Sequence, residues 1–255
     1  GSSRSEDDTK ALQEVVERDG VNKNGYSQSR RADMYLLDLN LTFSHFVNDE
    51  KAILDYTKKM TDLYELNPHL IEYSKIGYVS SLYNLTKACI ANNKMDNALK
   101  SLDSLEKCKD LYEIATSLNI GSRVYFYSTN LRLEMNLNFK DYAAISDLIT
   151  SRESEFDKFS PYIGKPQLYE NLFYKAKFCF ETGDFNKALK HTNLILNDLN
   201  FKEREDLLSI TRLLNLLIHF EINRDFSLDY LTKQTLNYFK RRKRLFLLED
   251  ELIRF

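Results

Sequence analysis

The chain has 255 residues, of which 43% are hydrophobic and 29% are charged, and its formal net charge is −2. This composition is typical of a soluble protein with a sizeable core, and it argues against a surface built throughout for nucleic acid or acidic membranes. The sequence contains only 7 Gly and 3 Pro. Because hairpins and tight loops need these residues, we expect long helices. The apolar runs are far shorter than the roughly 18 residues of a membrane span, so we expect no membrane-spanning helix.

The chain begins with the polar stretch GSSRSEDDTK, which contains no apolar signal region. Since the first residue is not Met, we interpret residues 1–3 as a cloning remnant and the rest as part of a longer protein, from which a signal peptide could have been removed. We expect residues 1–29 to be a polar segment with a short helix. The cysteines Cys89, Cys108 and Cys179 are odd in number and widely spaced. That pattern favours a reducing compartment, so we expect a cytoplasmic location.

Beyond this segment, apolar residues recur at helical spacing and predict five helix pairs. In chain order the pairs are 30–47 with 50–66, 69–91 with 95–116, 121–137 with 141–157, 166–182 with 185–198, and 202–222 with 227–250. Pro68 lies where a helix can begin, and the stretch with Pro161, Gly164 and Pro166 is the clearest loop. We interpret residues 30–255 as one array of helix pairs, not as two domains.

The clearest turn within a pair is Gly183-Asp184-Phe185. Gly183 is the residue expected for a left-handed cap at a helix C-terminus, and Asp184 begins the next helix with a charge that suits the helix dipole. Ala188 then lies where the second helix must approach the first. We expect the inward face of the pair to carry Leu172, Ala176, Cys179 and Phe180 on the first helix and Ala188, Thr192, Ile195 and Leu199 on the second.

Similar turns recur along the chain. They are Asn48-Asp49, Asn93-Lys94-Met95, Asp141-Tyr142 and Asp225-Phe226. The turns lie roughly 40 to 47 residues apart, within the range of periods that marks helical repeats. Cys89 takes the same place in its repeat as Cys179, which predicts that both are small buried apolar residues and not reactive thiols.

The order of Leu172, Ala176, the Gly183 turn and Ala188-Leu189 resembles a tetratricopeptide repeat. That pattern uses a bulky residue, a small one, a Gly turn, an aromatic and a second small residue. The ending LLNLLIHFEINRDFSLDYLTKQTLNYFKRRKRLF is also similar to the C-terminal end of large tetratricopeptide-like proteins of Bacteroidetes. The resemblance implies an all-α fold in which antiparallel helix hairpins stack into a right-handed superhelix. It implies no known reaction.

No group of residues points to catalysis. The sequence contains four histidines, His45, His69, His191 and His219. None has a second ligand at metal-binding spacing. A glycine-rich phosphate loop and a nucleophile elbow are both missing from the sequence, and adjacent acids on a helix diverge by about 100°. We therefore expect a protein that is not an enzyme and uses no metal or cofactor.

A basic run near the C-terminus has two interpretations. The run is Lys240, Arg241, Arg242, Lys243 and Arg244. We favour a polar outer face for the last helix, with long basic stems covering aromatic neighbours. The alternative is a site for a phosphate backbone or an acidic partner, although five consecutive charges cannot all face one ligand. We do not expect nucleic acid as the partner.

In tetratricopeptide-like arrays the first helix of each pair lines a concave groove. The resemblance places there Tyr83, Lys87, Tyr127, Asn130, Glu134, Glu170, Phe173, Lys177, Glu181, Thr211 and Glu221, with Leu214 and Ile218 beside them. Aromatic side chains supply contact area and charges set register, so this set suits a protein or peptide ligand. The alternative is that Tyr83, Tyr127 and Phe173 pack between neighbouring hairpins.

Our leading hypothesis is a non-enzymatic scaffold that binds an extended or helical protein segment in this groove. The second hypothesis is an effector-sensing or regulatory module of a longer signalling or transcription protein. The sequence leaves the identity of the partner and the oligomeric state open.

Overall fold

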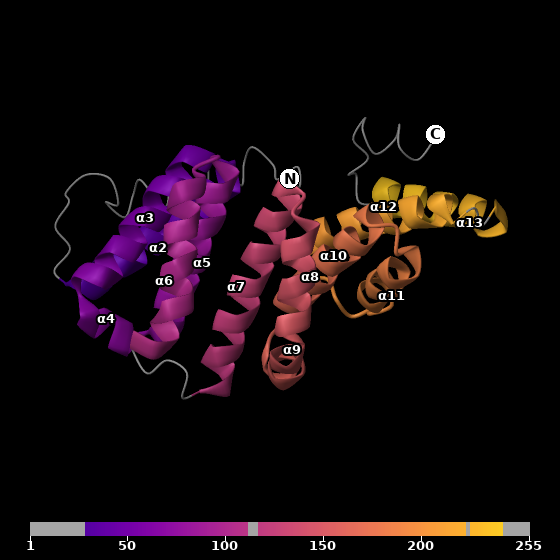
Figure 1. The fold of residues 1–255 in the computed structure, drawn as a ribbon. Coiled ribbons are helices and arrows are strands. Elements are labelled where there is room, and N and C mark those ends of the chain that lie inside the picture. The colour runs from indigo at the N-terminus through magenta and orange to yellow at the C-terminus, as the bar shows by residue number, and fades with distance from the viewer. Residues whose placement is uncertain (1–28, 112–116, 223–224, 242–255) are drawn as a thin grey trace. The chain divides into compact units, whose positions relative to one another are not determined.

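The computed structural model describes residues 29–111, 117–222 and 225–241 (Figure 1). Every regular element in these residues is a helix, as the composition predicts. The elements are α2 (Arg30–Val47), α3 (Glu50–Leu66), α4 (Pro68–Tyr73), α5 (Lys75–Ala91), α6 (Met95–Leu111), α7 (Leu118–Phe139), α8 (Tyr142–Ser151), α9 (Glu153–Phe159), the 3₁₀ helix η2 (Ser160–Tyr162), α10 (Lys165–Glu181), α11 (Phe185–Leu196), α12 (Glu205–Glu221) and α13 (Asp225–Arg241). The chain divides into two compact units, Gly1–Leu131 and Arg132–Phe255.

In the first unit, α3 packs against both α2 and α5, and α5 packs against α6. The second helix of one pair therefore also contacts the first helix of the next pair. Leu82, Leu102 and Leu105 are almost completely buried in this unit, as are Leu70 and Ile71 of the short α4. Burial of such side chains contributes about 1.5–3 kcal/mol each to the free energy of unfolding.

The second unit repeats this arrangement, because α11 packs against both α10 and α12, and α12 packs against α13. Ala176 of α10 and Ala188 of α11 belong to the same core cluster and are completely buried. A larger side chain at either position would push the two helices apart. A smaller cluster around Leu133, Leu137 and Ile145 packs the end of α7 and α8 against Tyr174 and Phe178 of α10.

In four of the helix pairs, the turn that connects the two helices has the same backbone geometry. The turn residue has a positive φ in each case: 55° at Asn48, 56° at Asn93, 56° at Lys140 and 81° at Gly183. The next residue donates its backbone N–H to a carbonyl five positions back, for example Asp184 to Cys179 over 2.8 Å. This hydrogen bond defines a Schellman motif. The turns lie 45, 47 and 43 residues apart, so the repeated punctuation of the sequence corresponds to a repeated backbone structure.

An aspartate follows three of these turns and begins the next helix. The side chains of Asp49, Asp141 and Asp184 accept backbone N–H groups from the residues three positions later, over 3.0 to 3.2 Å. Each aspartate is thus a helix N-cap. The fifth expected turn, before Asp225-Phe226, falls at residues outside the described part of the chain.

Two predicted helices are interrupted. The helix expected over 69–91 breaks at Ser74, which has a φ of −145° and caps α5 by accepting the N–H of Gly77. The helix expected over 141–157 breaks at Arg152 into α8 and α9. Helical periodicity continues across both breaks, so it could not reveal them.

The expected inward face of the α10–α11 pair is confirmed except at two residues, Phe180 and Leu199. Phe180 is only half-buried. Leu172, Cys179 and Ile195 are buried, but Leu199 is 84% exposed because α11 ends at Leu196. All three cysteines are free and buried. Burial raises the pKa of the Cys89 and Cys179 thiols, which favours their protonated form.

Candidate functional site

A groove of about 460 Å³ lies on the second unit. Its walls come from the end of α7 and from α10 and α12, which are the first helices of successive pairs. The lining residues are Glu134, Leu137, Asn138, Phe173, Tyr174, Lys177, Phe180, Glu181, Ile210, Leu213, Leu214 and Leu217. We call this hollow the α10 groove. It is within the size range of roughly 300–1,000 Å³ that is usual for ligand sites.

One wall of the α10 groove is apolar and open to solvent. Ile210, Leu213, Leu214 and Leu217 recur at helical spacing on α12. Ile210 is 49% exposed and Leu217 is 38% exposed, whereas Leu214 is buried. A stripe that begins in the core and continues onto an open surface is typical of a contact face.

Charged side chains of α7 and α10 also line the α10 groove. Lys177 Nζ lies 3.7 Å from Glu181 Oε1 within α10, and Glu134 of α7 also lines the groove. A partly exposed pair of this kind contributes only about 0.3–0.5 kcal/mol to stability. Its charges remain accessible to a ligand, and the two acids outnumber the single base.

The first unit contains a different group of predicted residues. The rings of Tyr83 and Tyr127 stack with centroids 4.2 Å apart and an interplanar angle of 26°. Lys87 Nζ lies 5.9 Å from the Tyr83 ring centroid, and Arg123 Nη1 donates a hydrogen bond to the Tyr127 hydroxyl over 3.3 Å. Tyr127 is buried. These aromatics therefore pack on each other, which is the arrangement that the alternative interpretation predicts.

The remaining predicted positions lie apart from the α10 groove. Asn130 and Thr211 are completely buried, and the Thr211 hydroxyl donates to the Leu207 carbonyl within α12 over 2.6 Å. Glu221 is exposed at the end of α12 and is not among the residues that line the groove. Ile218 is buried in the core, and the buried Glu170 accepts a hydrogen bond from the Tyr174 hydroxyl over 3.5 Å.

Four of the eleven predicted positions thus line one hollow: Glu134, Phe173, Lys177 and Glu181. The groove positions predicted from the sequence do not include Ile210, Leu213 or Leu217, and Phe180 was expected on the inward face of its helix pair. Their spacing on the helices matches that of core residues. Only the way α12 lies beside α10 leaves part of this stripe open.

Most of the basic run lies outside the described residues. Lys240 is exposed on α13, and α13 ends at Arg241. Arg242, Lys243 and Arg244 are not described. Both interpretations of the run therefore stay predictions.

No protein-family model, curated protein or solved structure that we compared with the chain matches it. Within the described ranges, no helix combines the length and the apolar character that crossing a bilayer requires. The same residues contain no group of three or more His, Cys, Asp or Glu side chains that could hold a metal ion.

Proposed function

We propose that this chain is a non-enzymatic, tetratricopeptide-like interaction scaffold and that the α10 groove binds a peptide segment of another protein. The observation that carries this proposal is the origin of the lining residues, since all of them come from the first helices of successive pairs, α7, α10 and α12. In the family that the sequence resembles, these helices carry the ligand groove.

The lining specifies the chemistry of the peptide. Ile210, Leu217 and Phe180 offer apolar surface to two or three apolar side chains of an amphipathic segment. The acids Glu134 and Glu181 outnumber Lys177. A lysine or arginine in the segment is therefore attracted to the groove more strongly than an acidic residue would be. We therefore propose an amphipathic peptide with apolar anchors and at least one basic residue.

The sharpest test changes the exposed apolar wall. Leu217→Glu puts a charge in the groove, and because Leu217 is 38% exposed, the substitution leaves the core intact. Peptides selected from a displayed random library on the wild-type chain should follow the proposed pattern. Their affinity for the variant should fall at least about fivefold, the effect of losing a contact worth more than about 1 kcal/mol.

Leu194→Glu is the matched control. Leu194 is 51% exposed on α11 and does not line the groove, so the same substitution there should leave peptide affinity unchanged. Tyr127 is a poor choice for such a test because its burial would mix a loss of stability with a loss of binding. A library that yields no binder, or binders equally tolerant of both variants, would disprove the assignment of the groove.

A further inference from the structure

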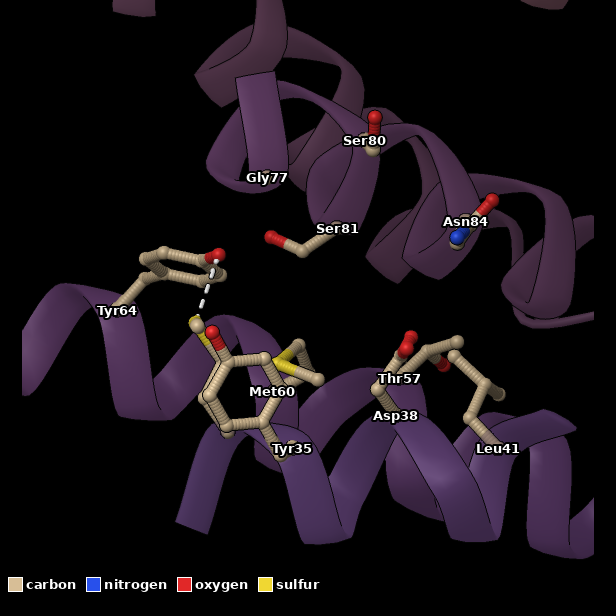
Figure 2. A pocket seen from close by; sticks show the side chains of 11 residues that line it. Tyr35, Asp38, Leu41, Thr57, Met60, Tyr64, Gly77, Ser80, Ser81 and Asn84 are labelled. Carbon is tan, nitrogen blue, oxygen red and sulfur yellow. Dashed lines mark hydrogen bonds between the residues drawn. The ribbon is translucent and has the colours of Figure 1, made fainter. Parts of the chain in front are cut away.

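A second hollow lies in the first unit and is lined by residues of α2, α3 and α5. Its volume is about 220 Å³, and the lining residues are Met34, Tyr35, Asp38, Leu41, Thr57, Met60, Tyr64, Gly77, Ser80, Ser81 and Asn84. Figure 2 shows Ser80 and Asn84 on one side and Tyr35, Asp38 and Leu41 on the other. We call it the α2–α5 pocket. It is smaller than most ligand sites and suits a single side chain or a small molecule.

Gly77 explains how the pocket keeps its shape. A Cβ atom at this position would overlap the Tyr64 hydroxyl, so the glycine makes room for the phenol against α5. The Tyr64 hydroxyl donates a hydrogen bond to Met34 Sδ over 3.2 Å (Figure 2). A glycine inside a helix costs about 1 kcal/mol relative to alanine. Here the missing side chain leaves room for Tyr64, whose ring sets the distance between α2 and α5.

Three polar side chains of the pocket have no partner of their own. Among the described residues, the side chains of Asp38, Ser80 and Asn84 make no hydrogen bond or ion pair to another residue. Asp38 is the charged residue of the lining. A carboxylate, a hydroxyl and an amide oxygen are all acceptors, so together they suit a ligand that donates several hydrogen bonds from a positive centre.

Part of the pocket lining suits an aliphatic chain. Met34, Leu41 and Met60 are buried and contribute apolar surface to the lining. Thioether and aliphatic side chains adapt to a flexible hydrocarbon stem.

We propose that the α2–α5 pocket binds an alkylammonium group, either on a lysine side chain or on a free aliphatic amine. The ammonium group lies at Asp38, Ser80 and Asn84, and its hydrocarbon stem rests on Met34, Leu41 and Met60. Arg31 lies 4.0 Å from the Tyr73 ring centroid, near the Tyr35 end of the pocket. Repulsion from this guanidinium places the bound cation at the Asp38 end. The site is independent of the α10 groove.

The test is an NMR titration of the isotope-labelled chain with n-butylammonium, with a capped lysine derivative, and with the neutral n-pentanol. Backbone signals of Gly77, Ser80 and Asn84 should shift with the cations. Shifts with n-butylammonium assign the pocket to any alkylammonium group. Shifts with the lysine derivative alone assign it to a side chain on a peptide.

Asp38→Asn should weaken binding about tenfold, the usual effect of removing a hydrogen bond to a charged group. Asp33→Asn is the matched control: this aspartate also lies on α2, but its partner is Arg30 and it does not line the pocket. It should leave the affinity unchanged. Equal shifts with n-pentanol, an unchanged affinity of Asp38→Asn for the cations, or no shift with either cation would each overturn the proposal. None of these outcomes depends on peptide binding at the α10 groove.

Discussion

At the scale of single residues, Asp198 has two close polar partners. Its Oδ2 atom accepts hydrogen bonds from Lys165 Nζ over 2.5 Å and from the Tyr169 hydroxyl over 2.6 Å. The Lys165 bond and then the Tyr169 bond lower the pKa of Asp198 to about 2. Burial and the bond to Asp198 raise the pKa of Tyr169 to about 12. This cluster connects the start of α10 with the chain that follows α11.

The Asp198 cluster predicts an acid-dependent loss of stability. A carboxylate whose pKa is lower in the folded chain stabilises it above the unfolded pKa of 3.8, and this contribution disappears as the pH falls through about 2. Asp198→Asn should therefore lower the urea midpoint at pH 7 and match the wild type near pH 2. Asp147→Asn, at an exposed α8 site, should change neither value. A difference that stays constant across this range would contradict the prediction.

His191 predicts a second pH dependence, at milder acidity. Burial, then the nearby charges of Lys175 and Lys190, lower its pKa from 6.5 to about 4, and Nδ1 has no hydrogen-bond partner among the described residues. The unfolded chain binds this proton first, so stability should decrease as the pH falls from 6.5 to 4. In His191→Leu, the urea midpoint should change less with pH over this interval than it does in the wild type. If the pH dependence of the midpoint is unchanged in the variant, other titrating groups cause it.

At the scale of the elements, the repeated Schellman turns use three kinds of residue at the same backbone position. Glycine adopts positive φ without penalty, asparagine tolerates it, and a lysine pays a steric cost because of its Cβ. Gly183 and Lys140 thus adopt a similar backbone conformation, which glycine tolerates well and lysine tolerates poorly.

We predict opposite effects of substitution at these two turns. Gly183→Ala should lower the free energy of unfolding by about 1 kcal/mol, since its φ of 81° strains any residue with a Cβ. Lys140→Gly should raise it by a few tenths to about 1 kcal/mol. Chemical denaturation of both variants measures these changes, and two changes of the same sign would argue against a shared turn geometry.

Only some residues of the α10 groove could be predicted from the helical pattern of the sequence. The resemblance to a tetratricopeptide repeat predicted which helices carry a groove, and four residues selected on that basis line the α10 groove. The helical period alone could not separate Thr211, which is completely buried, from Ile210, which is half exposed. Adjacent residues on a helix point about 100° apart, and the neighbouring helix decides which of them is covered.

At the scale of the whole molecule, the division into two units predicts that each can open separately. Cys89 and Cys108 belong to the first unit and Cys179 to the second, and all three are buried. Reagents that modify thiols will reach them only when the surrounding unit opens. The three cysteines therefore report on the two units separately.

Leu172→Ala tests this division. Leu172 is buried in the core of the second unit, and its truncation should lower the stability of that unit by about 2–5 kcal/mol. Modification of Cys179 should accelerate strongly, while Cys89 and Cys108 keep their wild-type rates. Mass spectrometry of the labelled peptides measures all three rates in one sample. Equal acceleration at all three cysteines would mean that the chain opens as a single cooperative unit.

By itself, the sequence determined the helical class, the positions of the turns within the pairs and the burial of the cysteines. These features depend on local chemistry: the backbone freedom of Gly183, the capping carboxylate of Asp184 and the apolar period of each helix. The tertiary structure alone decided the breaks at Ser74 and Arg152, the stacking of Tyr83 on Tyr127 and the openings of both hollows. Those features depend on contacts between residues far apart in the chain, such as Tyr64 against Gly77, which no local pattern encodes.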